Sequence, residues 1–155
     1  TPLHKKKHNK INSNNYCLNN YPIKIIIGPL DIIQYQIYLY TTIKCILNRF
    51  LPDIIYKKIP GKLYTIIMID IDAVGFDNYL HMMTINNSEI IVPYIPPKPP
   101  ANTGNHSYLF LVSIQTEYLT DICVNHRENF KLDNFISENK LFSSKYFTFI
   151  VDSTV

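Results

Sequence analysis

Short runs of β-branched and aromatic residues, separated by proline and asparagine, dominate the hydrophobic pattern of the chain. The clearest run, residues 64–72 (YTIIMIDID), is apolar at nearly every position, which predicts a central strand covered on both faces. Residues 79–86, 106–115 and 146–151 predict three further strands because they combine Val, Ile, Thr, Tyr and Phe. The pattern therefore indicates a mostly β fold.

The remaining segments are shorter or ambiguous. Residues 23–27 predict a strand that ends at a Gly-Pro turn. Residues 32–48 fit one or two strands or a helix, although their β-branched and aromatic content favours strands. Residues 130–140 predict a short helix. Residues 93–104 (PYIPPKPPANTG) contain five prolines, which predict an extended surface loop because proline cannot donate to a sheet.

The charge of the chain is unevenly distributed between a terminal arm and the body. We expect a polar arm at residues 1–21 and a single domain at residues 22–155. Four of the 15 basic residues lie within the first ten positions, namely Lys5, Lys6, Lys7 and Lys10, and the other basic residues nearly balance the 12 acidic ones. Such arms commonly contact nucleic acid or anionic surfaces, and a solvated tail is the plainer alternative.

Composition excludes several classes of protein. The chain is 46% hydrophobic and 17% charged, which excludes a disordered chain. Its three cysteines are far apart and lack metal-type spacing, so we expect a reducing compartment and neither a disulfide framework nor a metal or other cofactor. No apolar run approaches the ~20 residues that cross a bilayer. Only four glycines are present, so turns must rely on proline and asparagine.

Five polar residues lie near the ends of the predicted strands. Asp70 and Asp72 alternate at the end of one strand, and His106 and Tyr108 alternate at the start of another, so each pair is expected to share a face. His81 lies near the start of a third strand. If these ends meet, the side chains form a small-ligand site beside the proline-rich loop. In the plainer alternative, Asp72 starts a turn, Asp70 accepts a backbone N–H and His81 packs in the core.

These motifs, taken in order, resemble the phosphatidylethanolamine-binding-protein (PEBP) family. The resemblance rests on residues 61–65 (GKLYT), 70–74 (DIDAV), 80–82 (LHM), 93–97 (PYIPP), 104–108 (GNHSY), 130–135 (FKLDNF) and 146–147. It implies a large central antiparallel sheet packed on a smaller sheet, with few short helices. It also implies that phosphate-bearing groups such as phospholipid headgroups are received by Asp70, Asp72, His81, His106 and Tyr108. The family's fold adds a final helix close to position 155, where this sequence stops.

The sequence departs from the family pattern around these five residues. Ile71 and Val74 replace the prolines of the Asp-Pro-Asp-x-Pro motif, Met82 replaces a tryptophan, and Ser107 replaces the arginine of Gly-x-His-Arg-Tyr. These changes indicate that the chemistry of the site is relaxed while the sheet is kept. One branch of the family, a protein of the mitochondrial large ribosomal subunit, has a similarly eroded motif.

The resemblance implies a structural, non-enzymatic component of the mitochondrial large ribosomal subunit in the matrix. Its basic arm, Lys5 to Lys10, would contact rRNA, and neighbouring ribosomal proteins would be further partners. The alternative is a soluble, cytoplasmic protein that binds a phosphate-bearing ligand, such as a phospholipid headgroup, or regulates a signalling partner. An enzyme is disfavoured because Cys123 and Ser107 lack the strand–turn–helix context of a nucleophile.

Overall fold

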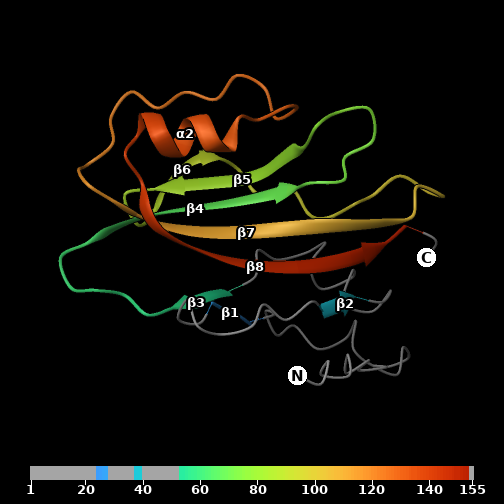
Figure 1. The fold of residues 1–155 in the computed structure, drawn as a ribbon, viewed down its shortest axis with the longest axis horizontal. Helices are drawn as coiled ribbons and strands as arrows, with labels where there is room; N and C mark the ends of the chain where they lie inside the picture. The colour runs from blue at the N-terminus through green and yellow to red at the C-terminus, as the bar shows by residue number, and fades with distance from the viewer. Residues whose placement is uncertain (1–23, 28–36, 40–52, 154–155) are drawn as a thin grey trace, which may run out of the picture.

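The computed structural model of the chain describes residues 24–27, 37–39 and 53–153 (Figure 1). Their elements are β1 (Lys24–Ile27), β2 (Ile37–Leu39), β3 (Asp53–Tyr56), β4 (Leu63–Asp70), β5 (Tyr79–Ile85), β6 (Glu89–Val92), β7 (Asn105–Gln115), α2 (Leu132–Glu138) and β8 (Phe142–Asp152). The expected arm at residues 1–21, with Lys5, Lys6, Lys7 and Lys10, lies outside the described residues, as does most of the ambiguous segment 32–48. Within the described ranges, no helix is long and apolar enough to span a membrane.

Six strands form the main sheet in the order β2-β8-β7-β4-β5-β6. The strands from β8 to β6 are antiparallel to their neighbours, and β2 pairs with β8 in parallel. β4 lies between β5 and β7, and six of its eight residues are buried, which explains its nearly continuous apolar sequence. β1 and β3 form a smaller parallel sheet. The predicted mostly β fold, with a large antiparallel sheet and a smaller one, is confirmed.

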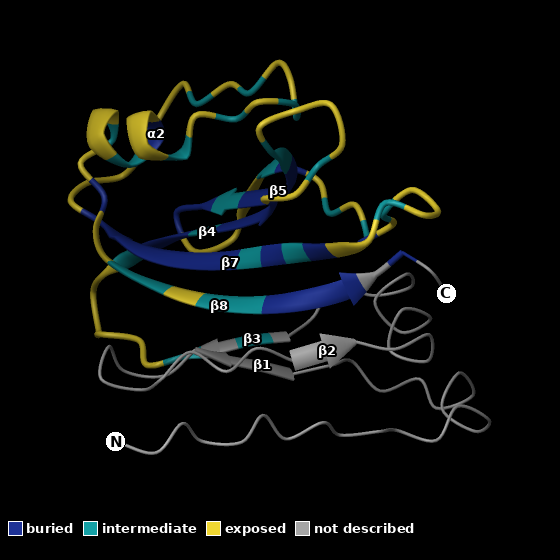
Figure 2. Ribbon diagram, turned by 45° about the vertical axis from the view of Figure 1, so that its right-hand side comes forward, coloured by how far each residue is buried: buried dark blue, intermediate teal, exposed yellow. Residues whose placement is uncertain are grey.

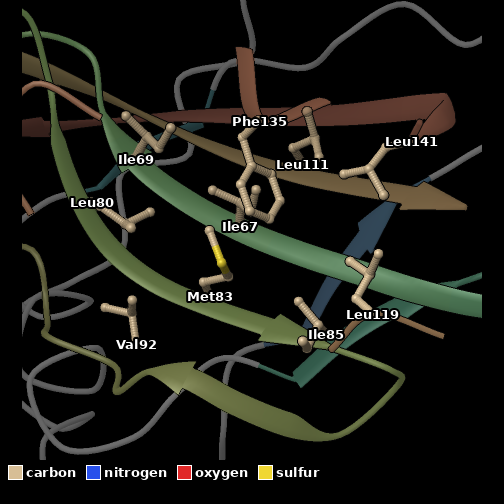
Figure 3. Close-up of a cluster of buried hydrophobic side chains, with 10 residues drawn as sticks. All are labelled: Ile67, Ile69, Leu80, Met83, Ile85, Val92, Leu111, Leu119, Phe135 and Leu141. Atoms are coloured by element: carbon tan, nitrogen blue, oxygen red, sulfur yellow. The ribbon is translucent and has the colours of Figure 1, made fainter. Parts of the chain in front are cut away.

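Alternate side chains of the main sheet build two hydrophobic layers. On one face α2 and its flanking loops cover the sheet, and Figure 3 shows the ten buried side chains of that layer: Ile67, Ile69, Leu80, Met83, Ile85, Val92, Leu111, Leu119, Phe135 and Leu141. On the other face, Ile54 and Tyr56 of β3 pack against a cluster that includes Tyr64, Met68 and Phe110. The sheet is therefore covered on both sides (Figure 2).

Asparagine takes many of the turn positions that glycine usually fills. Of the seven non-glycine residues with positive φ in the described chain, four are asparagines: Asn86, Asn87, Asn102 and Asn129. Asn86 and Asn87, with φ of 52° and 71°, turn the chain from β5 into β6. This confirms the expected reliance on asparagine. β6 itself is absent from the sequence-based prediction, although an Asn-Asn turn followed by Ile90-Ile91-Val92 is its signal.

Two predicted boundaries were wrong. β4 ends at Asp70 rather than at residue 72, because the Asp70 carboxylate accepts the backbone N–H of Asp72 at 2.8 Å and starts a turn. β8 begins at Phe142 rather than at residue 146, because polar residues between these positions conceal the strand while β7 pairs with it. The predicted short helix is confirmed as α2, in which Phe135 is the buried residue. Residues 93–104 form no strand, as predicted.

Candidate functional site

Asp70 lies where three strand ends meet. It is the last residue of β4 and is directly opposite Tyr108 on β7 and Tyr79 on β5. Its side chain is almost fully buried, which is costly for a carboxylate unless hydrogen bonds replace water. One carboxylate oxygen accepts the N–H of Asp72, and the other lies 2.9 Å from His106 Nδ1. Asp70 therefore joins the turn after β4 to the start of β7.

Asp72 lies beside Asp70 but not on the strand. It is exposed, and its Oδ2 accepts the backbone N–H of Ser107 at 2.7 Å. Ile71 N–H donates to the Ser107 carbonyl at 3.0 Å, so the turn is bonded to β7 twice. The prediction that Asp70 and Asp72 share one face of a strand is wrong, because the strand ends between them. The structure nevertheless brings both carboxylates to the same part of β7.

His106 has both ring nitrogens engaged within the protein and is 1% exposed. Its Nδ1 faces the Asp70 carboxylate at 2.9 Å, and its Nε2 lies 2.7 Å from Thr103 Oγ1. The Thr103 hydroxyl donates its single proton to the Pro100 carbonyl at 2.6 Å, so toward His106 it can only accept. Neither ring nitrogen of His106 is therefore left to face a ligand. The imidazole links β4 to the proline-rich segment through two hydrogen bonds.

Tyr108 shares the face of Asp70 and is 1% exposed. Its ring stacks on Phe149 with centroids 5.3 Å apart and meets the edge of His81 at 5.2 Å. Burial raises the pKa of Tyr108, and the negative charge of Asp70 and a hydrogen bond to that carboxylate raise it further. Burial also raises the pKa of Tyr94 on the proline-rich segment. Tyr108 is therefore a neutral donor at physiological pH, and its partner is Asp70.

His81 reaches this cluster because β5 is irregular at that point. Met82 pairs with Met68 and Leu80 pairs with Ile69, so His81 is the extra residue of a β-bulge. His81 Nδ1 lies 2.6 Å from the Ile95 carbonyl, which can only accept, so Nδ1 carries a proton.

Burial lowers the pKa of His81. The hydrogen bond to Ile95 and the charge of Asp70 oppose this effect, while the charge of Arg127 adds to it. The neutral form of His81 is thus favoured at physiological pH. With its proton on Nδ1, a neutral ring presents a lone pair at Nε2 rather than a donor.

Arg127, which no sequence motif marks, holds the bulge in place. Its Nη1 donates to the carbonyls of Leu80 and His81 at 3.2 and 3.1 Å, and its Nη2 donates to the Pro93 carbonyl at 2.9 Å. The Ile95 N–H adds a bond to the His81 carbonyl at 2.9 Å. A bulge interrupts the ladder of hydrogen bonds, so its carbonyls need such partners. Arg127 therefore attaches the start of the proline-rich segment to β5.

The polar cluster of Asp70, His81, Thr103, His106 and Tyr108, which we call the strand-end cluster, is closed by the protein's own hydrogen bonds. In the part of the chain that the structure describes, no buried side-chain nitrogen or oxygen lacks a partner. Within the same residues, no group of three or more His, Cys, Asp or Glu side chains is placed to hold a metal ion. An anion site needs donors that face the ligand, whereas those of His106 face Asp70 and Thr103. The geometry of the cluster therefore suits a structural role, in which its side chains connect neighbouring strands.

Comparison with known proteins shows which fold this is. No family model matches the sequence. The structure superposes on a carboxypeptidase Y inhibitor, solved in complex with its cognate proteinase, with a TM-score of 0.50 and 19% identity over 61% of this chain and 63% of that one. The chain has a PEBP-like fold. It spans less than two thirds of the length of the inhibitor.

Two structures named as phosphatidylethanolamine-binding proteins are also similar. A homologue from Chlamydia trachomatis matches with a TM-score of 0.45 and 17% identity over 61% of this chain and 75% of that one. A protein from Plasmodium vivax matches with a TM-score of 0.42 and 18% identity over 60% of this chain and 66% of that one. At such identities the likeness concerns the PEBP-like fold alone, and function has to be argued from the site.

Proposed function

We propose that this chain is a non-catalytic scaffold protein of the mitochondrial large ribosomal subunit, located in the matrix, with rRNA and neighbouring ribosomal proteins as partners. The observation that carries the proposal is the closed strand-end cluster. Of the residues to which the family resemblance assigns phosphate binding, Asp70, His106 and Tyr108 hydrogen-bond within the strand-end cluster, and Asp72 and His81 bond to backbone groups. The PEBP-like fold is thus kept without the free donors that an anion site requires.

The eroded motif supports the same proposal. Ser107, which stands where the family pattern has an arginine, contributes its backbone N–H and C=O to the turn at residues 71–72 instead of a cation. Neutral His81 likewise adds no positive charge. A scaffold needs only the shape of the domain, and the lysines of the arm, Lys5 to Lys10, would supply affinity for RNA phosphates.

Native sedimentation tests this proposal. Mitochondria from cells that express the tagged chain are lysed gently, and the lysate is separated on a sucrose gradient. We expect the chain to co-sediment with the large ribosomal subunit and to leave it at high salt, because phosphate contacts are screened. A chain that remains at the top of the gradient at low salt would rule out the ribosomal role.

A second candidate function is the binding of a phosphate-bearing ligand, such as a phospholipid headgroup, by a cytoplasmic protein. The observation that favours it is that side chains from β4, β5 and β7 converge beside the proline-rich segment. Because His81 is neutral, an anion would bind best after this ring takes up a proton. Binding would therefore tighten as pH falls, by at most about tenfold per pH unit for one linked proton.

Calorimetry with phosphoethanolamine and with inorganic phosphate, each at neutral and mildly acidic pH, tests the second candidate. Binding with proton uptake that is lost in His81→Gln would support it. The absence of binding heat at both pH values, with millimolar ligand, would remove it. Inorganic phosphate separates recognition of a bare phosphate from recognition of the whole headgroup.

A further inference from the structure

The connection between β3 and β4, residues 57–62 (KKIPGK), carries three exposed lysines: Lys57, Lys58 and Lys62. We call it the basic turn. In Figure 1 it leaves the sheet as the teal connection between β3 and β4, and in Figure 2 it is coloured as exposed. No acidic residue occurs between Asp53 and Asp70, so the local charge of this segment is uncompensated along the sequence. The two ion pairs of the described residues, His106–Asp70 and Lys131–Asp77, lie elsewhere.

The basic turn is fixed by its own hydrogen bonds. The backbone N–H of Ile59 donates to the hydroxyl of Tyr64, a buried residue of β4, at 2.7 Å. Lys62 N–H donates to the Ile59 carbonyl at 3.2 Å, and Gly61 adopts the φ of 78° that closes the turn. The ammonium group of Lys58 lies 5.4 Å from the centre of the Tyr56 ring. A fixed turn presents its charges with less loss of entropy on binding than a mobile tail does.

The acidic groups of the domain do not cancel this charge. Asp70 and Asp72 lie at the opposite end of β4, which is eight residues long, so the separation is about 25 Å. That distance exceeds the Debye length of about 8 Å at physiological salt. Glu89 and Glu117 belong to the near end of the sheet, but among the described residues neither forms an ion pair with a lysine of the basic turn. The basic turn thus remains attractive to a polyanion.

We propose that the basic turn is an RNA-contacting element of the folded domain, which binds phosphates through Lys57, Lys58 and Lys62 independently of the N-terminal arm. This inference rests on the proposed ribosomal function for its choice of RNA over other polyanions. Lysines contact phosphates as point charges without reading bases, so the contact positions the domain on RNA and carries no sequence specificity.

Binding of the full chain to a mixed-sequence RNA duplex, followed by fluorescence anisotropy across a salt series, tests the inference. The variant Lys57→Gln/Lys62→Gln removes two charges and keeps the contact between Lys58 and the ring of Tyr56. The matched control Lys98→Gln/Lys131→Gln removes two exposed lysines outside the basic turn. We expect the turn variant to reduce the magnitude of the slope of log K against log salt by about 1.4 to 1.8, and the control to leave it unchanged.

The outcomes separate this inference from the ribosomal proposal. An unchanged salt slope in the turn variant, with thermal unfolding like that of the control, overturns the inference even if the chain co-sediments with ribosomes. If the turn variant has a reduced salt slope but the chain does not co-sediment with ribosomes, the ribosomal role is wrong and the inference about the basic turn stands. If the turn variant changes only the binding to vesicles that contain phosphatidylserine, the surface recognises lipid and the assignment to RNA is wrong.

Discussion

Asp70 and His106 meet in the interior with 5% and 1% of their surfaces exposed, and each is a hydrogen-bond partner of the other. A carboxylate without partners at such a position would be costly, because water no longer solvates it. Thr103, the N–H of Asp72 and the hydroxyl of Tyr108 complete the hydrogen bonds of the pair. These residues therefore have a structural role. Replacing them should lower the free energy of unfolding more than it changes the affinity for any ligand.

The variant Asp70→Asn tests this role. An amide group can place an N–H against the N–H of His106, which leaves a buried donor unpaired. We expect a loss of about 3–5 kcal/mol in the free energy of unfolding, measured with urea, as for other broken buried pairs. Asp77→Asn is the matched control, because Asp77 forms an exposed ion pair with Lys131 at 3.5 Å. Equal, small losses in both variants would contradict the structural role of the Asp70–His106 pair.

The pH dependence of stability should carry the signature of His81. Its pKa is lower in the folded protein than the ordinary 6.5, so the unfolded chain binds the proton more readily. Stability is therefore unaffected by this group above about that pH and falls as the pH drops below it. Urea unfolding from neutral to mildly acidic pH should show this loss, and His81→Gln should reduce it. An identical pH profile in the variant would exclude His81 as its source.

All residues of the strand-end cluster except Thr103 could be predicted from the sequence, but their hydrogen bonds could not. Alternation and the family resemblance point to Asp70, His106 and Tyr108, whose placement follows from strand register. Thr103 lies in a segment that the sequence marks only as a loop, and Arg127 belongs to no motif. The ring of His106 is bonded to Thr103 and the ring of His81 to the Ile95 carbonyl, so whether the imidazoles are free depends on loop geometry that local patterns do not encode.

At the scale of elements, the bulge in β5 and the proline-rich segment form one unit. The bulge turns His81 toward Tyr108, and Arg127 ties the carbonyls of the bulge to the carbonyl of Pro93. The pattern of apolar residues predicts β5, because its side chains are mostly buried. It cannot predict the bulge, because one inserted residue changes the pairing without changing the composition.

Replacing Arg127 should loosen this unit while leaving the rest of the sheet intact. In Arg127→Ala the carbonyls of Leu80, His81 and Pro93 lose a donor. We expect a loss of about 1–3 kcal/mol and faster hydrogen exchange at the Ile95 amide, with unchanged exchange in the middle of β7. Arg127→Lys should restore part of the protection, because an ammonium group also donates. Uniform acceleration across the sheet would indicate a general structural effect instead.

At the scale of the molecule, two layers of side chains hold the sheet between α2 and the smaller sheet (Figures 1 and 2). The mostly β architecture could be predicted because the residues that build it form periodic runs. β6 is missed by the search for long apolar runs, because only Val92 of its four residues is buried and the Asn-Asn turn before it is the stronger signal. A short edge strand has too few apolar residues for its hydrophobic pattern to be distinguished from that of a loop.

The covered sheet should unfold as one unit. Leu111 is fully buried in the layer beneath α2, whereas Leu109 on the same strand and face is partly exposed. We expect Leu111→Ala to cost about 2–5 kcal/mol and Leu109→Ala to cost less, with one urea transition seen by both circular dichroism and tyrosine fluorescence. Separate transitions would mean that the layers are independent.

Imidazole nitrogen NMR of the full chain at neutral pH, without ligand and with millimolar phosphoethanolamine, tests most directly whether the strand-end cluster is closed to an anion. We expect the His106 signals to stay unmoved when the ligand is added, because both ring nitrogens already have partners within the protein. His106 signals that shift with phosphoethanolamine would contradict this expectation.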